Sequence, residues 1–375
     1  MVLAVYDLVA TGTIASQATR GFVFFVAKTV RRNMNPVRFA VVGCGNIGSR
    51  HLAIVNAQPG AVLAGFCDSD PVKLEKYASL YEGTPAYASI EEMLDLCEAS
   101  VINVCTPHYL HAEHALKAIE AGRNVLVEKP MALRSQDASQ MIQAAAKAGV
   151  LLMVVKQNRH NIPVVLTREA LDAGRFGRIL MAQCNVVWNR YAGYYSQSPW
   201  LGRRELEGGA LYTQVSHFLD LLIWLCGDVV DAGGKFETKN HAIDIEDCGT
   251  AWLRFSSGTM GSLLWTTCAY NRNFEGSITL IGEHGIVKIG GQYLNRIEHW
   301  DVEGVPLREG TEWVDRPNSY GHYQGSSSNH DKVIQDVIRR VNREDARVVS
   351  GEDGIRTVQA IELIYAKCAE RRELR

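Results

Sequence analysis

The 375-residue sequence has no run of apolar residues long enough to span a bilayer, for which about 20 are needed. It also has no excess of one charge, because 39 basic and 41 acidic residues leave a net charge of −2. That balance argues against a general nucleic-acid-binding surface. None of its nine cysteines forms a CxxC pair, so neither a disulfide framework nor a cysteine-based zinc site is indicated. Scattered cysteines are typical of reduced thiols, and we expect a cytoplasmic protein without a membrane partner.

The chain is too long for one ordinary hydrophobic core, which predicts two domains. Its first 36 residues stand apart from the rest, with one acidic residue, a basic end and a short apolar run, GFVFFVA. This run lacks the preceding basic region of a secretory signal. We therefore expect residues 1–36 to form an extension outside the fold.

Residues 37–157 alternate between short apolar runs and segments of helical periodicity. The apolar runs are VRFAVVG, AVLAGFC, SVINVCTP, RNVLVEKP and VLLMVVKQ, and the helical segments include NIGSRHLAIVNA, SIEEMLDL and SQDASQMIQAAAKAG. Such alternation predicts a Rossmann-type, doubly wound parallel sheet with ligands at the carboxyl ends of its strands.

Residues 158–375 have a different pattern, with many strand candidates joined by Gly or Ser turns. These strands are ILMAQCNVVW, VVDAGGKFET, CGTAWLRFSS, TMGSLLWTTCA, GSITLIG, GIVKIGG and LNRIEHW. A long apolar helix, GALYTQVSHFLDLLIWLCG, lies between the first two strands, and two helices close the chain. The pattern predicts an α+β domain with a large, mostly antiparallel, open-faced sheet.

A glycine motif, VVGCGNIG, places Gly43, Gly45 and Gly48 between the first strand and the first helix. Glycines at this spacing let the backbone approach a pyrophosphate, and the helix N-terminus favours the anion. Asp68 ends the second strand about 20 residues further on, where an acid binds the adenosine ribose. We expect a dinucleotide, with NAD favoured over NADP, although Lys73 and Lys76 nearby leave NADP open.

Three histidines, His108, His111 and His114, are spaced for one helical face in TPHYLHAEH. That spacing is compatible with a metal site. However, no carboxylate or cysteine ligand follows, so solvated histidines or a cofactor contact from His111 are favoured, and we predict no metal.

A charged pair, Glu128 and Lys129, ends the apolar run NVLVEKP and is followed by Pro130. Burying a lysine is unfavourable unless it is paired or functional. A surface lysine at a strand end is the other interpretation. Because Lys129 follows the carboxyl end of a predicted parallel strand, where such sheets bind ligands, a functional lysine is favoured.

Together, the glycine motif, CTPHYLH, EKP and GGALYTQVSHFLDLL resemble the Gfo/Idh/MocA oxidoreductases, from Val37 to about Ala369. The segments VVKQNRHN, VVWNR, YYSQSPW, EGSITLIGEHGIVKIGG and IEHW are similar to one branch of that family. The branch contains the bacterial UDP-N-acetyl-2-amino-2-deoxyglucuronate dehydrogenases. It oxidises the C3 hydroxyl of UDP-N-acetylglucosaminuronic acid (UDP-GlcNAcA) on the way to diaminouronic acids of surface polysaccharides.

The resemblance implies two catalytic residues, Lys129 and His217. In the family the lysine lies at the nicotinamide and contacts the reacting hydroxyl, often with a cis bond to the following proline, here Pro130. His217 matches the family's catalytic histidine, the base that removes the hydroxyl proton. Lys129 supplies positive charge to the developing alkoxide, Glu128 orients it, and NAD carries the hydride.

The resemblance also implies binding residues. The cofactor residues are Gly43, Gly45, Asn46, Ile47, Gly48, Asp68, Thr106, Pro107, His111, Glu128, Lys129, Gln157 and Trp200. The substrate residues are Lys129, Asn158, Arg159, Arg190, Tyr195, Thr213, Gln214 and His217. A diphosphate and a carboxylate on the substrate call for arginines, which bind such groups bidentately. A solvated or salt-bridged arginine is the alternative at Arg159 and Arg190.

The chain departs from the family pattern at two positions. Relatives carry aspartate, or asparagine in the uronate branch, where this chain has Thr213, and they often carry arginine where it has Leu201. Threonine weakens a contact to a hydroxyl without removing the base. Arg203 or Arg204 is expected to substitute for the missing arginine.

Two other functions remain open, a dehydrogenase of another sugar or inositol and a non-catalytic NAD-binding regulator. The presence of both Lys129 and His217 argues against the regulator. Relatives associate through the open sheet face, so we expect a homotetramer. The expected partners are a UDP-sugar and 2-oxoglutarate as hydride acceptor.

Overall fold

The computed structural model describes residues 35–307, 317–319 and 324–370. The extension expected at residues 1–36 lies outside these ranges except for its last two residues. Within the described ranges, no helix combines the length and apolar character that a membrane span needs.

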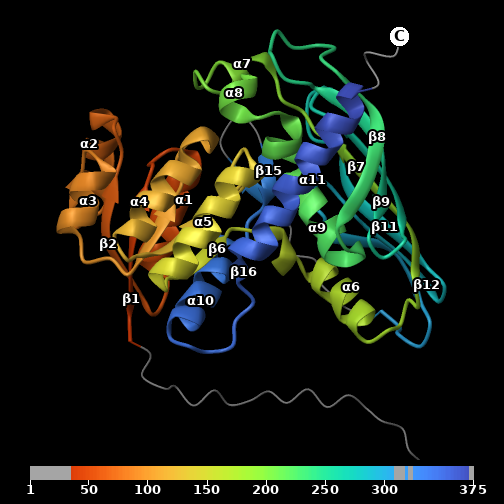
Figure 1. Ribbon diagram of the computed structural model, residues 1–375, viewed down its shortest axis with the longest axis horizontal. Coiled ribbons are helices and arrows are strands. Elements are labelled where there is room, and N and C mark those ends of the chain that lie inside the picture. Colours follow the sequence, from red (N-terminus) through yellow and green to blue (C-terminus); the bar gives the residue numbers. More distant parts are fainter. Residues whose placement is uncertain (1–34, 308–316, 320–323, 371–375) are drawn as a thin grey trace, which may run out of the picture. The chain divides into compact units, whose positions relative to one another are not determined.

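The first sheet has seven strands in the order β16-β6-β5-β4-β1-β2-β3 (Figure 1). Its strands are β1 (Val37–Val42), β2 (Ala61–Cys67), β3 (Ala86–Tyr87), β4 (Val101–Val104), β5 (Asn124–Val127), β6 (Leu152–Val154) and β16 (Val349–Ser350). All neighbours are parallel except β16 and β6. The chain proceeds from β1 toward β3 on one side and from β4 toward β6 on the other. The point where this order reverses, between β1 and β4, is where such sheets bind ligands.

Helices connect these strands. They are α1 (Asn46–Ala57), α2 (Pro71–Leu80), α3 (Ile90–Leu96), α4 (His111–Glu120) and α5 (Ser135–Ala148), with the 3₁₀ turn η1 (His108–Leu110) before α4. A capping box begins α3, because Glu92 N donates to Ser89 Oγ at 3.1 Å. In return, Glu92 Oε2 accepts from Ala88 N at 3.1 Å. The helix α2 was not predicted.

The second sheet has seven strands in the order β13-β12-β11-β7-β10-β9-β8. They are β7 (Ile179–Val187), β8 (Val229–Glu237), β9 (Cys248–Phe255), β10 (Met260–Thr266), β11 (Glu275–Gly282), β12 (Gly285–Gly290) and β13 (Arg296–Val302). Only β7 and β10 pair in parallel. The two sheets confirm the predicted fold class.

The remaining elements lie around the second sheet or join the two sheets. They are η2 (Gln157–His160), α6 (Ile162–Asp172), α7 (Ala192–Tyr195), α8 (Arg204–Glu207), the π-helical turn η3 (Leu211–Val215), α9 (Ser216–Cys226), β14 (Pro317–Ser319), β15 (Gln324–Ser327), α10 (His330–Val341) and α11 (Gly351–Glu370). The helix α9 is buried along nearly its whole length, which explains its continuous apolar sequence. Of these elements, the sequence predicted only the long apolar helix and the two helices at the end.

The last part of the chain returns to the first sheet (Figure 1). Val333, Ile334, Val337 and Ile338 of α10 share one hydrophobic cluster with β1, β5 and β6, and β16 pairs with β6. Assigning every residue after 157 to the second domain therefore misses this return. A two-residue strand has no sequence period by which it could be predicted.

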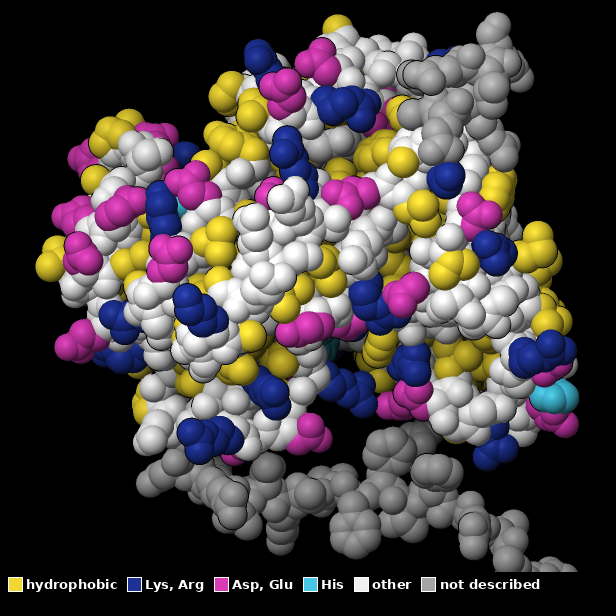
Figure 2. Space-filling view, viewed as in Figure 1, with side chains coloured by type: hydrophobic (Ala, Val, Ile, Leu, Met, Phe, Trp, Pro, Cys, Tyr) yellow, Lys and Arg dark blue, Asp and Glu magenta, His cyan; other side chains and the backbone are white. Residues whose placement is uncertain are grey.

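On the face drawn in Figure 2, basic and acidic side chains are interspersed. This distribution agrees with the near-zero net charge and with a small-molecule ligand rather than a polyanion.

Candidate active site

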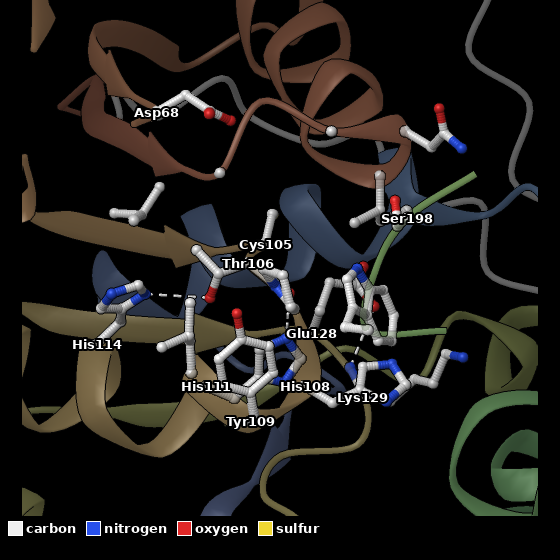
Figure 3. Close-up of a pocket in the computed structure, with 18 of the residues that line it drawn as sticks. Asp68, Cys105, Thr106, His108, Tyr109, His111, His114, Glu128, Lys129 and Ser198 are labelled. Atoms are coloured by element: carbon white, nitrogen blue, oxygen red, sulfur yellow. Dashed lines mark hydrogen bonds between the residues drawn. The ribbon is translucent and has the colours of Figure 1, made fainter. Parts of the chain in front are cut away.

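A cavity of about 630 Å³ lies at the switch point of the first sheet and extends to the start of α9 (Figure 3). Most predicted site residues line it: Gly43, Gly45, Asn46, Ile47, Asp68, Thr106, Pro107, His111, Glu128, Lys129, Gln157, Arg190, Trp200, Thr213, Gln214 and His217. Three predicted substrate residues, Asn158, Arg159 and Tyr195, do not.

The glycine loop fits a pyrophosphate. A Cβ on Gly43, whose φ is +90°, would lie 2.8 Å from the Cys105 carbonyl oxygen, and one on Gly48 would lie 1.7 Å from the Gly43 carbonyl oxygen. Gly45 has open space beside it. Thus Gly43 and Gly48 bring the strand and helix together, while Gly45 leaves room for a ligand.

Asp68 borders the same loop and is 9% exposed. Its Oδ2 accepts from Cys44 N at 2.7 Å and its Oδ1 from Asp70 N at 2.9 Å. Lys73 Nζ lies 3.6 Å from Asp68 Oδ1. The carboxylate is therefore fixed at the end of the second strand, in the place expected for a ribose ligand.

Lys129 lies at the other end of the cavity and is joined to Pro130 by a cis peptide bond, as the resemblance implied. Its Nζ donates to the Thr213 carbonyl oxygen at 2.7 Å. Burial lowers the pKa of Lys129 to about 8, although the negative charge of Glu128 acts to raise that pKa. The ammonium form remains accessible near neutral pH, but its proton is weakly held.

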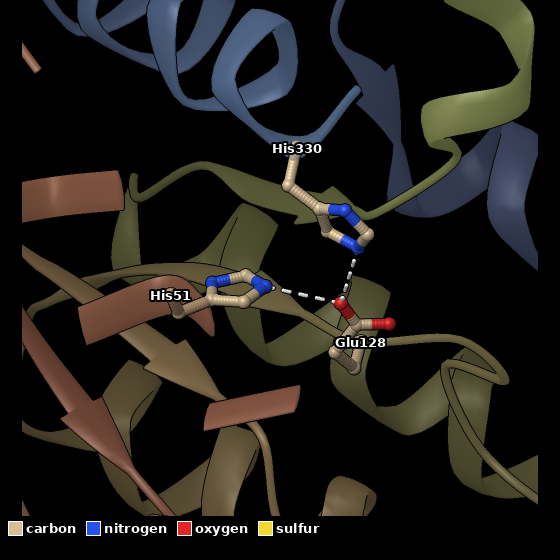
Figure 4. Close-up of side chains that lie close together, drawn as sticks. All are labelled: His51, Glu128 and His330. Atoms are coloured by element: carbon tan, nitrogen blue, oxygen red, sulfur yellow. Dashed lines mark hydrogen bonds and ion pairs between the residues drawn. The ribbon is translucent and has the colours of Figure 1, made fainter. Parts of the chain in front are cut away.

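Glu128 is held between two histidines from distant parts of the chain (Figure 4). Its Oε1 lies 3.0 Å from His51 Nε2 and 3.4 Å from His330 Nε2. Its Oε2 accepts from Lys129 N at 3.1 Å. Burial alone would raise the pKa of Glu128, but its contacts with His330 and His51 hold that pKa well below its usual range. Glu128 therefore stays ionised and fixes the backbone of Lys129.

His217 faces the cavity from the first turn of α9. Burial, and then the charges of Lys129 and Lys156, keep its pKa well below the usual range, so the imidazole is neutral and able to accept a proton. The Gln157 amide nitrogen lies 3.2 Å from His217 Nε2. The π-helical turn η3 lies directly before α9 and directs the Thr213 carbonyl toward Lys129. Such π turns are frequent at functional sites.

Arg159 does not reach the cavity, which corrects its assignment to the substrate. Its Nε and Nη2 donate to the two carboxylate oxygens of Asp220 on α9, at 2.9 and 2.8 Å. Its Nη1 donates to Asp353 of α11 at 2.5 Å. The turn η2 points Gln157 into the cavity and Arg159 away from it.

Asn158 and Tyr195 are also corrected. The Asn158 side-chain oxygen accepts from Ser326 Oγ at 2.6 Å, which ties η2 to β15. The Tyr195 hydroxyl lies 3.2 Å from Thr267 Oγ1. Its neighbour Tyr194 lines the cavity instead.

Arg190 is the predicted arginine that does line the cavity, and it is 2% exposed. Its guanidinium lies 5.2 Å from the ring centres of both Trp188 and Tyr194. One Nη donates to Gln214 Oε1 at 2.5 Å and the other to the Asn189 carbonyl at 2.6 Å. A cation held this rigidly at the cavity is suited to recognition of a carboxylate.

Each histidine of the predicted cluster has hydrogen-bond partners within the protein. His108 Nδ1 lies 3.1 Å from the Glu207 carbonyl, and His114 Nδ1 lies 3.1 Å from Thr106 Oγ1. The ring nitrogens of His111 lie 2.6 and 2.8 Å from the carbonyls of Pro130 and Thr106. His111 borders the cavity, but both of its ring nitrogens contact backbone carbonyls of the cavity wall.

Leu201 lines the cavity, whereas Arg203 and Arg204, the expected substitutes for a missing arginine, do not. Arg204 lies over the Tyr365 ring, and its Nη2 is 3.7 Å from Glu246 Oε2. Sequence reasoning also missed His330, which enters the site from α10 and has no local motif.

Two family descriptions match the chain. "Oxidoreductase family, NAD-binding Rossmann fold" matches residues 37–156, and "GFO/IDH/MocA C-terminal domain" matches residues 164–288. The chain belongs to the Gfo/Idh/MocA oxidoreductase family. It is therefore an NAD-dependent oxidoreductase, and the glycine loop with Asp68 fits that cofactor.

Within the Gfo/Idh/MocA family, two solved structures are similar over most of the chain. The WlbA dehydrogenase from Bordetella pertussis, in complex with NADH and UDP-GlcNAcA, is 36% identical with a TM-score of 0.80, covering 90% of this chain and 97% of that one. The WlbA dehydrogenase from Chromobacterium violaceum, with the same two ligands, is 36% identical with a TM-score of 0.81, covering 90% and 94%.

A curated relative is more distant. The 1-carboxy-3-chloro-3,4-dihydroxycyclohexa-1,5-diene dehydrogenase of Comamonas testosteroni is 28% identical over 256 residues. The alignment covers 66% of this chain and 62% of that protein, which is less than two thirds of the relative's length.

Proposed function

We propose that the protein oxidises the C3 hydroxyl of UDP-GlcNAcA with NAD⁺ to the 3-keto sugar, in the biosynthesis of diaminouronic acids of bacterial surface polysaccharide. The observation that carries the proposal is the joint position of Lys129, His217 and Arg190 on one cavity. The 36% identity to two dehydrogenases that bind NADH and UDP-GlcNAcA supports the choice of sugar.

The roles follow from the charge states. Neutral His217 accepts the proton of the C3 hydroxyl. NAD⁺, which the glycine loop and Asp68 would hold, would supply the hydride acceptor. Lys129 uses one N–H for the Thr213 carbonyl, which leaves others to stabilise the developing alkoxide. Because Glu128 fixes the lysine backbone, this donor is in place before the reaction begins.

Arg190 is the candidate ligand for the uronate carboxylate. It is buried, and two aromatic rings and Gln214 hold it at the cavity. A site built around a carboxylate discriminates against the neutral sugar, because its buried cation is then left without that partner.

A dehydrogenase of a neutral sugar or inositol is the second candidate. The observation that favours it is the commitment of Arg159 to Asp220, which leaves one of the two predicted arginines for an acidic substrate. The non-catalytic regulator has no such support, because both proposed catalytic residues lie on the cavity.

We also propose that the open face of the second sheet joins copies of the chain into a tetramer. Met181, Trp252, Met260 and Leu264 are 53%, 41%, 63% and 43% exposed and belong to neighbouring strands of that sheet. Contiguous exposed apolar side chains mark association surfaces. All nine cysteines are free thiols, which supports the expected cytoplasmic location.

The test is a panel of UDP-sugars incubated with NAD⁺, with and without 2-oxoglutarate, the proposed hydride acceptor. We expect UDP-GlcNAcA to lose two hydrogens, detected by mass, and neutral UDP-N-acetylglucosamine to react poorly. Detection by mass avoids missing activity in which bound NADH is reoxidised before release. Equal rates on both sugars, or activity on free inositol alone, would contradict the uronate assignment.

A further inference from the structure

The loop between β8 and β9 is organised around a buried carboxylate, that of Asp247, which is 0% exposed. This carboxylate accepts hydrogen bonds from three successive backbone amides, those of Lys239, Asn240 and His241, at 2.7, 2.8 and 3.0 Å. Burial opposes ionisation of Asp247, but these hydrogen bonds lower its pKa to about 2. The loop is therefore fixed around a charged acceptor, and His241 is part of it.

The ring of His241 connects this carboxylate to the arginine at the cavity. Its Nδ1 lies 3.0 Å from Asp247 Oδ2, and its Nε2 lies 2.6 Å from the carbonyl oxygen of Arg190. Carboxylate and carbonyl oxygens only accept hydrogen bonds, so both ring nitrogens are donors. The His241 side chain is 5% exposed, which keeps water away from both hydrogen bonds.

The carbonyl of Arg190 lies where the chain leaves the second sheet. The strand β7 ends at Val187, and Arg190 N still donates to the Thr267 carbonyl at 2.8 Å. The next residue, Tyr191, already precedes α7. A buried carbonyl oxygen needs a donor, and His241 provides the one that a neighbouring strand would otherwise give.

His241 acts on the cavity from behind its wall. Arg190 lines the cavity, whereas His241 and Asp247 do not. The ring centre of Tyr195 lies 5.1 Å from that of His241, and the Tyr195 hydroxyl lies 3.2 Å from Thr267 Oγ1. The imidazole is therefore held between Asp247 and α7, with its Nε2 directed at the backbone of Arg190.

We propose that His241 is a positioning residue, which fixes Arg190 for the uronate carboxylate through its hydrogen bond to the Arg190 carbonyl. The inference rests on the role proposed above for Arg190. Recognition of a carboxylate by a guanidinium depends on orientation, so an arginine whose backbone can shift discriminates less well between acidic and neutral sugars. No motif in the sequence indicated His241.

Two amide variants separate this hydrogen bond from the other contacts of the ring. The side-chain nitrogen of glutamine can take the place of histidine Nε2, whereas that of asparagine reaches only the place of Nδ1. His241→Gln should therefore keep the hydrogen bond to Arg190, and His241→Asn should lose it. His241→Phe, which keeps a ring beside Tyr195, should lose it as well.

The first measurement needs no sugar. Phenylglyoxal modifies arginine side chains, and peptide mass spectrometry gives the rate at Arg190 relative to exposed Arg254 in the same sample. His241→Asn and His241→Phe should raise this ratio by roughly 3- to 10-fold, because the loss of one buried hydrogen bond allows Arg190 to move. His241→Gln should stay close to wild type.

The second measurement is the ratio of kcat/KM for UDP-GlcNAcA and UDP-N-acetylglucosamine. His241→Asn and His241→Phe should reduce the preference for the acidic sugar by about 10-fold, through a higher KM with kcat close to wild type. His241→Gln should restore the preference. His284→Asn is the matched control, because His284 is exposed on the second sheet, and it should change neither measurement.

Equal results for His241→Asn and His241→Gln would overturn the proposal. So would an unchanged arginine ratio in a variant whose stability to urea falls, because His241 would then only stabilise the fold. If His241→Asn does not fold, His241→Phe decides the same question. A wild-type enzyme without preference between the two sugars would contradict the uronate assignment, while the phenylglyoxal ratio would still show whether His241 fixes Arg190.

Discussion

Two buried carboxyl groups, Asp220 and Glu207, differ in their surroundings. Asp220 on α9 accepts two hydrogen bonds from Arg159, and Lys156 Nζ lies 3.4 Å away. Burial opposes its ionisation, but these cations lower its pKa far below the usual range. Glu207 accepts a hydrogen bond from the Gly202 amide, and burial raises its pKa to about 7.

The comparison separates two uses of buried charge. The network around Asp220 is paired within itself and connects α9 to α11 through Arg159 and Asp353. The carboxyl group of Glu207 instead accepts from Gly202 N, in the loop that also carries Trp200 and Leu201 of the cavity wall. We infer that the first group stabilises the helix carrying His217 and that the second fixes the loop that carries Trp200.

The largest effect is expected from Asp220→Asn, which leaves Arg159 and Lys156 buried without their shared carboxylate. Breaking one partner of a buried ion pair costs about 3–5 kcal/mol. Urea unfolding of the variant should show that loss at pH 7. The control is Asp172→Asn, which removes an exposed partner of Arg168 and should change stability by less than about 1 kcal/mol. Equal losses in both variants would contradict a special role for the Asp220 network.

Lys129→Met should instead spare the fold and reduce turnover by about 10²-fold or more, because it removes charge stabilisation from the transition state. His217→Asn should behave similarly and flatten the acidic limb of the pH–rate profile, since the titrating base is gone. Steady-state kinetics together with NAD titration check both. Near-normal turnover in either variant would show that the assigned catalytic role is wrong.

The two arginines give a third way to sharpen the comparison. Arg190→Met should reduce the preference for UDP-GlcNAcA over UDP-N-acetylglucosamine by about 10²-fold, or about 3 kcal/mol, which is typical of losing a charge-assisted hydrogen bond. Arg159→Lys should lower stability and leave that preference unchanged, because Arg159 contacts Asp220 and Asp353. The ratio of kcat/KM for the two sugars, measured in each variant, shows which arginine binds the uronate carboxylate. A loss of preference only in Arg159→Lys would assign the carboxylate to Arg159 instead of Arg190.

Much of this fold could be predicted from the sequence because its signals are local. The glycine motif, the capping box at Ser89 and the apolar runs each report on their own neighbourhood, and each is found where expected. The return of β16 and α10 to the first sheet depends on pairing across nearly 200 residues, which leaves no periodic pattern.

The direction of side chains was the second feature that could not be predicted from the sequence. Gln157 and Arg159 belong to one motif, yet the 3₁₀ turn η2 sends one to the cavity and the other to Asp220. Glu207 lies in a charged stretch, RRELEGG, that is typical of an exposed loop. Its backbone carbonyl and its carboxyl group contact His108 Nδ1 and Gly202 N, which lie outside its own helix. Residue type predicted which groups matter more reliably than it predicted where they point.

The smallest expected effect concerns pH, and it separates the two carboxyl groups by sign. Asp220 has a lowered pKa, so its contribution to stability is present at neutral pH and is lost in acid. Glu207 has a pKa raised from 4.5 to about 7, so the folded protein keeps a proton that the unfolded chain has already released. Folding stability should therefore fall as the pH rises from about 5 to about 7, by on the order of 2 kcal/mol.

Glu207→Gln removes this term, because an amide does not titrate. The variant should match wild type near pH 5 and exceed it at pH 8 in urea unfolding, while Glu205→Gln should follow wild type at both values. A Glu207→Gln variant whose stability runs parallel to wild type from pH 5 to 8 would show that Glu207 ionises freely in the folded protein. The contrast with Asp220 would then be one of position and not of charge.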